Sequence, residues 1–309
     1  MNKIYDVIIL GGGPASMSAG IYAKQMGLNT LLIEKGEFGG QVATTSNVDN
    51  YLGFRNISGN DLSFAMHNHL ISTGIEIVNE EVVATDFSKD IKLVKTHANE
   101  YNAHTVIVGI GTSLRNLGVE KEKDFIGKGV SFSSLRDREK YENKIVAVVG
   151  GGNSAIEDAI YLSEKCKKVY LIHRRQEFRG DKGVLEKLYK LVDGGIVELV
   201  LDHRPHSIVG DEFVTGFNVL HIPSNNVKKL DVSAIFVAIG RGADTDIIDK
   251  NIMRDSSGYI VTDKKMQTNI GGVYAIGDIR NTPLRQIVTA VSDGAIASVS
   301  AFNYIKTKR

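Results

Sequence analysis

Short apolar runs alternate with helical spacings from the start of the chain. Residues 5–10 form an apolar run typical of a buried parallel strand, and the glycines at 11–13 end it. Pro14 suits the first turn of a helix, in which apolar residues recur at helical spacing until Gly27. A second apolar run covers residues 30–33. This order predicts a strand, a helix and a parallel strand, which is the βαβ unit of an α/β fold.

The glycine turn has the spacing of a dinucleotide-binding loop. Gly11 and Gly13 take the first two glycine places of the G-x-G-x-x-G pattern, and Ser16 replaces the third glycine. Glu34 ends the second strand roughly 20 residues later, where a carboxylate accepts hydrogen bonds from a free ribose but repels a phosphate. The candidate binding residues of this unit are Gly11, Gly13, Pro14, Ala15 and Glu34.

A second unit of the same plan begins at residue 145. An apolar run at 145–149 leads into the residues GGGNSA at 150–155, and the position of Glu34 is taken by His173, followed by two arginines. Because guanidinium groups bind phosphate through charge-assisted, often bidentate hydrogen bonds, we expect this unit to bind a nucleotide with a 2′-phosphate. The candidates are Gly150, Gly152, Asn153, Ser154, Ala155, His173, Arg174 and Arg175. FAD has the unphosphorylated ribose that the first unit should bind, and NADPH has the 2′-phosphate that the second unit should bind.

The residues after 240 have the pattern expected if the first unit resumes there. An apolar run at 273–276 ends in Gly277 and Asp278, and in two-dinucleotide flavoproteins such an aspartate holds the ribityl chain of FAD. A final helix that starts near 285–287 would direct its first amide groups at an electron-rich group, such as the flavin.

We therefore expect an α/β protein of two Rossmann-like dinucleotide-binding domains, with the NADPH domain inserted into the FAD domain. Residues 1–114 and 244–309 form the discontinuous FAD-binding domain in this interpretation. Residues 115–243 form the NADPH-binding domain. Apolar runs at 106–108 and 235–239, each ending in glycine, predict strands that close the two halves.

Composition excludes several other classes of protein. The 37 basic and 36 acidic residues leave a formal charge of +1, so no global field attracts nucleic acid or an anionic membrane. The chain has no uninterrupted apolar run of the roughly 18 residues that a spanning helix needs, and no secretory signal, so we expect a cytoplasmic protein. The eight histidines do not cluster with other ligands, and no metal site is expected.

These motifs together resemble the low-molecular-weight bacterial thioredoxin reductases, over nearly the whole chain. The resemblance implies a homodimer that binds FAD and NADPH. It also implies that Gly40, Gln41, Asn50 and Gln286 surround the flavin. The segments that carry the resemblance are 11–16, 39–41, Asn50, 150–155, 173–175, 277–278 and 283–287, the last of which includes Arg285 and Ile287.

The chain departs from this family between residues 129 and 143. The family has a Cys-x-x-Cys-Asp sequence there, whereas this chain has Ser133 and Arg136 in the cysteine places and Asp137 in the place of the acid. A hydroxyl and a guanidinium cannot cycle through a disulfide. The single cysteine, Cys166, lies at the predicted end of a helix far from the flavin and does not replace the pair.

Three functions remain open on this evidence. The favoured interpretation is an NADPH-dependent flavoenzyme that passes electrons to a non-disulfide acceptor such as ferredoxin, flavodoxin, quinone or dioxygen. The second is a disulfide reductase that uses the thiols of a partner, and the third is a flavin-binding sensor or scaffold without catalysis. For Arg136 there are two interpretations: it lies close to the flavin and favours the anionic reduced form, or it pairs with a neighbour such as Asp137 or faces solvent.

Overall fold

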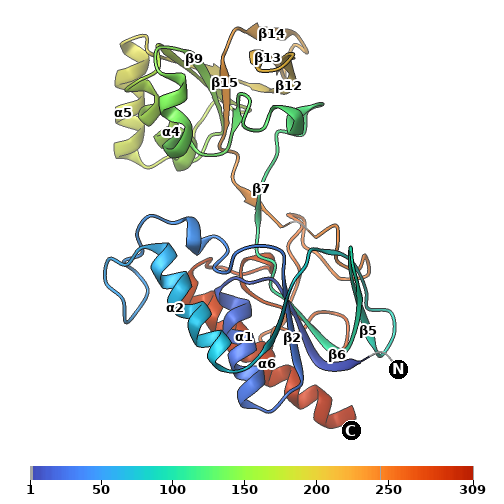
Figure 1. Cartoon of the computed structure of the whole chain (residues 1–309). Helices are drawn as coiled ribbons and strands as arrows, with labels where there is room; N and C mark the ends of the chain where they lie inside the picture. The colour runs from blue at the N-terminus through green and yellow to red at the C-terminus, as the bar shows by residue number, and fades with distance from the viewer. Residues whose placement is uncertain (1–2, 244, 309) are drawn as a thin grey trace. The chain divides into compact units, whose positions relative to one another are not determined.

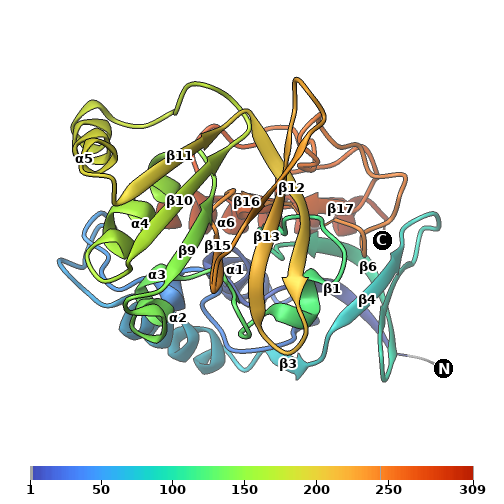
Figure 2. The same cartoon turned by 90° about the horizontal axis from the view of Figure 1, so that it is seen from above.

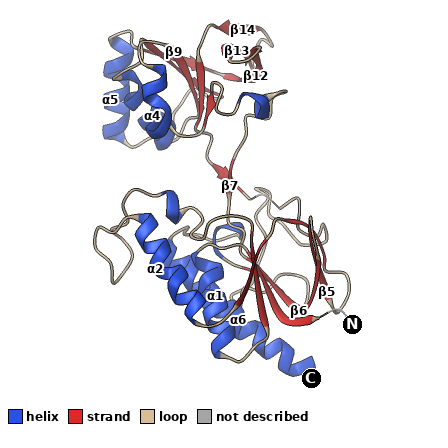
Figure 3. Cartoon of the chain, in the orientation of Figure 1, coloured by secondary structure: helices blue, strands red, loops and turns tan. Residues whose placement is uncertain are grey.

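The chain is divided into two compact units in a computed structural model that describes residues 3–243 and 245–308 (Figure 1). One unit contains residues 1–113 and 242–309, and the other contains residues 114–241. The expected domain boundary at residue 244 lies outside the described residues. Both units combine helices with a sheet, as the colouring by secondary structure shows (Figure 3), and an α/β fold is confirmed.

The discontinuous unit is built on a mainly parallel sheet. Its strands run in the order β3-β2-β1-β6-β5-β4, and β17 also pairs with β6. The parallel members are β1, β2, β3, β6 and β17, while β4 and β5 form an antiparallel extension. Their bounds are β1 Ile4–Leu10, β2 Thr30–Glu34, β3 Glu76–Asn79, β4 Val82–Asp86, β5 Lys92–Thr96, β6 Glu100–Val108 and β17 Val273–Ala275.

Three helices complete this unit, namely α1 (Pro14–Gln25), α2 (Gly59–Ser72) and α6 (Ile287–Lys308). Pro14 occupies the start of α1, as the sequence predicts, and Ser58 caps α2 by accepting a hydrogen bond from Asp61 N at 3.0 Å. Helices α1 and α6 lie side by side (Figure 1). Their apolar residues, with one set of strand side chains, form one buried cluster, and the opposite set of strand side chains forms a second.

The second unit has a parallel sheet and a small antiparallel sheet (Figure 2). The parallel order is β11-β10-β9-β15-β8, and helices α4 (Asn153–Ser163) and α5 (Lys182–Asp193) pack against it. The antiparallel sheet β12-β13-β14 follows β11 along the chain. The bounds are β8 Val130–Ser131, β9 Ile145–Val149, β10 Lys168–His173, β11 Val197–Leu201, β12 His203–Gly210, β13 Val214–His221, β14 Val227–Leu230 and β15 Ala234–Val237.

The chain crosses between the units twice, at β7 (Ser113–Leu114) and β16 (Arg241–Gly242), and these two short strands pair with each other. A short helix, α3 (Ser134–Asp137), and four 3₁₀ turns complete the structure over the described residues: η1 Val42–Thr44, η2 Glu122–Phe125, η3 Arg138–Tyr141 and η4 Gly277–Ile279. None of the helices in the described part of the chain combines the length and apolar character needed to cross a bilayer.

Candidate functional site

The turn between β1 and α1 presents backbone amides to open space. Gly11 has φ +100°, and a Cβ there would lie 2.6 Å from Gly109 O, so only glycine fits. Gly13 is the N-cap of α1, no side chain caps it, and a Cβ on it would meet no atom within 4 Å. The free N–H groups and the positive end of the helix therefore form a site for an anion such as a pyrophosphate.

Ser16 fits the place of the third glycine without loosening the turn. The residue is fully buried, and its Oγ lies 3.3 Å from both Leu10 O and Gly109 O. Its hydroxyl therefore joins the ends of β1 and β6 beneath the loop. Glycine at position 109 makes this contact possible, because a Cβ there would lie 2.2 Å from Ser16 Oγ.

Glu34 lies at the end of β2 beside this turn. Its Oε1 accepts a hydrogen bond from Gly36 N at 2.9 Å, and its Oε2 lies 3.0 Å from where a Cβ on Gly12 would be. Glycine at position 12 is thus needed for the carboxylate to approach the loop. The arrangement places the acid where a ribose next to the pyrophosphate site would meet it.

The other flavin candidates gather around two hydrogen-bonded contacts in the same unit. Gln41 Nε2 donates to Thr112 Oγ1 at 3.0 Å and to Asp278 Oδ2 at 3.3 Å, which brings together three segments distant in sequence. Asn50 Nδ2 donates to Gln286 Oε1 at 3.2 Å. A Cβ on Gly40 would lie 3.5 Å from Gly13 Cα, so this loop borders the first turn.

The final helix begins at Ile287, close to the expected start. Pro14 and Ala15 form the first turn of α1, as expected, and Ala15 is buried. Arg285 lies with its guanidinium 4.1 Å from the centre of the Tyr259 ring, in a cation–π contact. Its side chain is therefore engaged with this loop of the protein in the described structure.

The second glycine turn repeats this geometry between β9 and α4. A Cβ on Gly150 would lie 2.3 Å from Ala238 O and 2.6 Å from the Ala155 methyl group, so the small Ala155 permits close packing. Gly152 is the N-cap of α4, has no side-chain cap, and has no atom within 4 Å of a built Cβ. Ser154 is exposed in the first turn of α4.

His173 lies against this turn. A Cβ on Gly151 would lie 2.0 Å from His173 Cε1, and the imidazole stacks on the Phe178 ring with centroids 5.2 Å apart. Burial lowers the pKa of His173, and the charges of Arg174 and Arg175 lower it further, so the ring is neutral at pH 7.

Arg174 and Arg175 are both exposed, and neither has an ion pair with any residue that the structure describes. The following loop folds back on the glycine turn, because Asn153 Oδ1 accepts from Asp181 N at 2.8 Å and Gly151 O accepts from Arg179 N at 2.8 Å. Arg174 and Arg175, two cations without an ion-pair partner among the described residues, thus follow His173 beside the uncapped N-terminus of α4. This arrangement fits a ribose that carries a phosphate.

Ser133, Arg136 and Asp137 form a capped and ion-paired turn. Ser133 Oγ accepts a hydrogen bond from Arg136 N at 3.3 Å and caps α3. Arg136 Nη2 lies 2.9 Å from Asp137 Oδ2, although 70% of the arginine side chain is exposed. Arg136 is therefore paired with its neighbour, which is the second of the two interpretations given above.

Asp137 is buried and receives further hydrogen bonds, from Ser131 Oγ at 2.7 Å and Lys140 Nζ at 2.8 Å. The Arg136 hydrogen bond, assisted by those from Lys140 and Ser131, holds the pKa of Asp137 well below its usual range. A carboxyl group that stays ionised and fully engaged does not act as a proton donor to a thiolate at neutral pH.

Cys166 belongs to the core of the second unit. It is buried, its Sγ lies 3.4 Å from Tyr141 O, and burial raises the pKa of its thiol to about 11. The thiol is therefore neutral and shielded at physiological pH. Within residues 3–243 and 245–308, no group of three or more His, Cys, Asp or Glu side chains could hold a metal ion.

Three residues near the flavin candidates were not identified from sequence. Thr112 bonds Gln41, and Asp293 and Arg280 form an ion pair behind Gly277. The sequence does contain a sign that Asp293 is unusual, since it is a single acid between small and apolar residues in the last helix. Its partner could not be identified, because the pairing depends on how α6 packs on the sheet.

Comparison with known proteins shows the family. The model for pyridine nucleotide-disulphide oxidoreductases matches residues 5–294. A thioredoxin reductase of Mycoplasma pneumoniae is 38% identical over 95% of this chain and 93% of its own, and one of Listeria monocytogenes is 36% identical over 98% and 95%. The crystal structure of Lactococcus lactis thioredoxin reductase superposes with a TM-score of 0.80 at 31% identity, covering 98% of this chain and 99% of the other.

These relatives overturn one prediction from the sequence. The favoured acceptor was a ferredoxin, flavodoxin, quinone or dioxygen, but the full-length relatives are thioredoxin reductases, which points to disulfide reduction. The prediction was wrong because it was based on one local replacement at 133–136, whereas the similarity extends over almost the whole chain.

The predicted enzyme class and cofactors are confirmed by the same comparison. Proteins of this family are FAD-dependent NAD(P)H oxidoreductases, and the family uses FAD and NADPH. The fold of two Rossmann-like domains is also that of the matching structures. A Cβ built on Gly13 or on Gly152 would meet no atom within 4 Å, so the space beside each of these glycines is open. The chain belongs to the pyridine nucleotide-disulphide oxidoreductase family, among relatives of the thioredoxin reductase type.

Proposed function

We propose that this chain is an NADPH-dependent disulfide reductase of the thioredoxin reductase type that has no redox dithiol of its own. Its substrate is the disulfide of a small thioredoxin-like protein. The full-length match to thioredoxin reductases is the observation that carries the proposal. NADPH, a proton and the disulfide yield NADP⁺ and two thiols, so electrons and protons balance.

The cofactors occupy the two glycine turns in this proposal. The residues that hold FAD are Gly11, Gly13, Pro14, Ala15, Glu34, Gly40, Gln41, Asn50, Asp278, Arg285, Gln286 and Ile287. The residues that hold NADPH are Gly150, Gly152, Asn153, Ser154, Ala155, His173, Arg174 and Arg175. FAD, when bound, takes up two electrons from NADPH and releases them to a disulfide. We assign FAD to the unit of residues 1–113 and 242–309, and NADPH to the unit of residues 114–241.

Because the chain has no redox dithiol, the cysteine pair that exchanges electrons with the flavin has to belong to the thioredoxin-like partner protein. Ser133 and Arg136 carry no sulfur, and Cys166 is buried with a raised thiol pKa. This makes the chain an atypical member of its family. We also propose that it acts as a homodimer in the cytoplasm, where thiols are kept reduced; light scattering of the FAD-loaded protein tests the dimer.

The test follows NADPH oxidation at 340 nm without oxygen, with oxidised thioredoxin as the substrate. We expect oxidation that depends on thioredoxin and stops when one equivalent of NADPH per disulfide has been consumed. The control is thioredoxin with both active-site cysteines replaced by serine. The proposal fails if the cysteine-free thioredoxin supports the same oxidation, or if intact thioredoxin supports none.

A gain-of-function variant tests the missing dithiol separately. Ser133→Cys with Arg136→Cys introduces the family's spacing at positions where Arg136 N and Ser133 Oγ already lie 3.3 Å apart. We expect the double variant to reduce a small aromatic disulfide with NADPH much faster than the unmodified chain. Ser133→Cys alone is the matched control, because a single thiol cannot complete the relay.

A further inference from the structure

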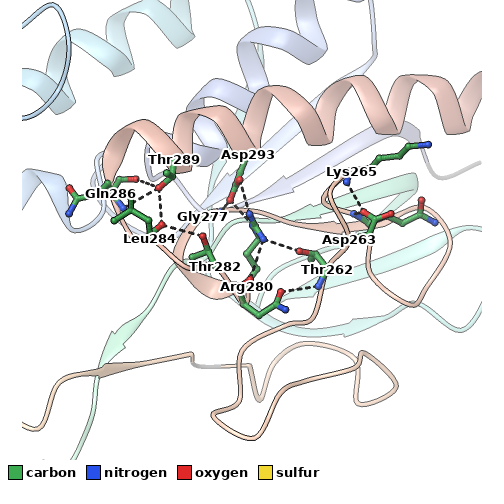
Figure 4. A network of polar contacts seen from close by, with 12 residues as sticks. Thr262, Asp263, Lys265, Gly277, Arg280, Thr282, Leu284, Gln286, Thr289 and Asp293 are labelled. Atoms are coloured by element: carbon green, nitrogen blue, oxygen red, sulfur yellow. Dashed lines mark hydrogen bonds and ion pairs between the residues drawn. The ribbon is translucent and has the colours of Figure 1, made fainter.

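A buried carboxylate, Asp293, lies among the segments assigned to the flavin. Asp293 is in the second turn of α6, its side chain is only 7% exposed, and its neighbours along the helix are small or apolar. A buried carboxylate in such a helix needs partners that replace water. Figure 4 shows that these partners come from the loop after β17.

The first partner is Arg280, which holds Asp293 through two hydrogen bonds. Arg280 Nε lies 2.7 Å from Asp293 Oδ2, and Arg280 Nη2 lies 3.1 Å from Asp293 Oδ1. The arginine is oriented in turn by Thr262 Oγ1, at 3.2 Å from Nη1, and by Asn281 O, at 3.3 Å (Figure 4). This bidentate geometry fixes the direction of the carboxylate as well as its charge.

The second partner is the backbone of the turn that carries Asp278. Gly277 N donates to Asp293 Oδ2 at 3.0 Å, in a buried position just after β17 has left the sheet. Gly277 has φ +67°, the left-handed conformation that glycine adopts without strain. The carboxylate therefore determines where the chain turns immediately before Asp278.

The same part of α6 also fixes α1. A Cβ on Gly294 would lie 2.1 Å from Ala15 O and 2.8 Å from Ala19 N, so the backbones of the two helices are in direct contact beside Asp293. One turn earlier, Thr289 Oγ1 accepts from Gln286 N at 3.2 Å and lies 3.0 Å from Leu284 O (Figure 4). The first turn of α1, the Gly277 turn and the start of α6 are thus held by one short stretch of α6.

We propose that Asp293, oriented by Arg280, is a positioning residue for the flavin: its hydrogen bond to Gly277 N sets the place of Asp278 relative to the start of α6. The inference rests on the proposed FAD site. A purely structural ion pair would stabilise the unit with and without FAD alike, and would leave the affinity for FAD unchanged. A positioning residue changes the affinity, because the turn must be ordered again when FAD binds.

Asp293→Asn tests the role with little change of shape. The amide keeps one oxygen for Gly277 N–H, but it turns an N–H₂ group toward Arg280 and removes the charge. The FAD dissociation constant is measured by the quenching of FAD fluorescence on titration of flavin-free protein. We expect the dissociation constant to rise at least tenfold, and the visible circular dichroism of FAD at saturation to change.

Arg254→Gln is the matched control in the same unit. The Arg254 guanidinium also anchors a loop, through Thr245 O at 3.0 Å and Ile248 O at 3.0 Å, but that loop contains no flavin candidate. We expect it to lower the unfolding midpoint without changing FAD affinity or dichroism. Arg280→Lys is the second variant in case Asp293→Asn does not fold; it keeps the charge, loses the bidentate geometry, and should raise the dissociation constant several-fold.

Two results overturn the inference. If folded Asp293→Asn and Arg280→Lys bind FAD with the affinity and dichroism of the unmodified chain, the pair is structural only and the proposed function stands. If the unmodified chain binds no FAD, the proposed function fails together with the inference.

Discussion

At the scale of single residues, we expect two exposed charges to determine which nucleotide the second unit prefers. Arg174 and Arg175 have no ion-pair partner in the described residues and follow His173 at the end of β10. Each arginine-to-alanine change should weaken NADPH binding by about 1.5 to 3 kcal/mol, which is the range for hydrogen bonds to charged groups, and should leave NADH nearly unaffected. Anaerobic titration of flavin reduction with each nucleotide measures both affinities.

Arg204→Ala provides the control for this prediction, because Arg204 is an exposed arginine of the same unit, on β12. Its removal lowers the net charge equally without touching the glycine turn. Equal losses for NADPH and NADH in the Arg174 and Arg175 variants would show that these residues do not contact the 2′-phosphate.

A buried charge gives the chain a specific pH dependence of stability. Because the pKa of Asp137 is held below its usual value, chiefly by the Arg136 hydrogen bond, the folded state binds this proton less readily than the unfolded state. The stabilisation is complete above about pH 4, the ordinary pKa of aspartate, and is lost as the pH falls toward the folded-state pKa. Asp137→Asn should cost about 1 to 3 kcal/mol at pH 7.

Urea unfolding at pH 7 and at pH 3 measures this effect. The difference between Asp137→Asn and the unmodified chain should shrink at the lower pH. Glu139→Gln is the comparison: the Glu139 side chain is 63% exposed where it pairs with Arg138 and Lys165, so its replacement should cost less than about 1 kcal/mol. An undiminished difference at pH 3 would mean that the ion pairs of Asp137 do not carry its contribution.

At the scale of elements, we expect two of the three glycines of the first turn, Gly11 and Gly13, to have separable roles. Gly11→Ala places a methyl group 2.6 Å from Gly109 O at φ +100°, so it should destabilise the fold by more than about 1 kcal/mol. Gly13→Ala has φ −75° and open space, so the flavin-free protein should keep its stability. The added methyl group instead occupies the approach of the pyrophosphate, and we expect FAD affinity to fall at least tenfold.

Thermal unfolding of flavin-free protein and fluorescence titration with FAD separate the two effects in these variants. Unchanged FAD binding by Gly13→Ala would remove the first turn from the proposed site. The reverse pattern, in which Gly13→Ala unfolds and Gly11→Ala does not, would contradict the local geometry described here.

The local elements were predictable from sequence where one short segment determines them. The strand at 5–10, the helix at Pro14, the second unit at 145–155 and the final helix near 287 all depend on neighbouring residues, and the structure has each of them. The contacts of Asp293 and Thr112 were not predictable, since they join segments far apart in the chain.

The antiparallel sheet β12-β13-β14 was also missed. Its strands have no apolar run longer than two residues that ends in glycine, and its register contains irregularities between Pro205 and Ser207 and between Val209 and Gly210. Such a sheet is defined by pairing between strands, which an unaligned sequence does not reveal. The non-disulfide acceptor was wrongly favoured for a related reason, because one replaced motif outweighed the similarity of the whole chain.

At the scale of the whole molecule, the unit of residues 114–241 is an insertion into the other unit, and its two ends meet. The chain leaves the first unit at β7 and returns at β16, and these strands pair, so Ser113 and Gly242 lie about one strand spacing, roughly 5 Å, apart. The core of the first unit contains residues from both flanking segments, such as Val106 and Val273, and none from the insertion. Removal of the insertion therefore leaves this core complete.

We expect a chain in which a short Gly/Ser linker replaces residues 114–241 to fold and to bind FAD in a 1:1 ratio. A loop of a few residues closes ends this near at little cost in entropy. Visible absorbance of the purified protein gives the FAD content, and dithionite should bleach the flavin whereas NADPH should not, because the second glycine turn has been removed. The separate segment 114–241 should bind NADPH by calorimetry, since it is continuous and has its own core. A linked chain that is folded but free of flavin, beside a full chain that holds FAD, would show that the FAD site needs residues of the inserted unit.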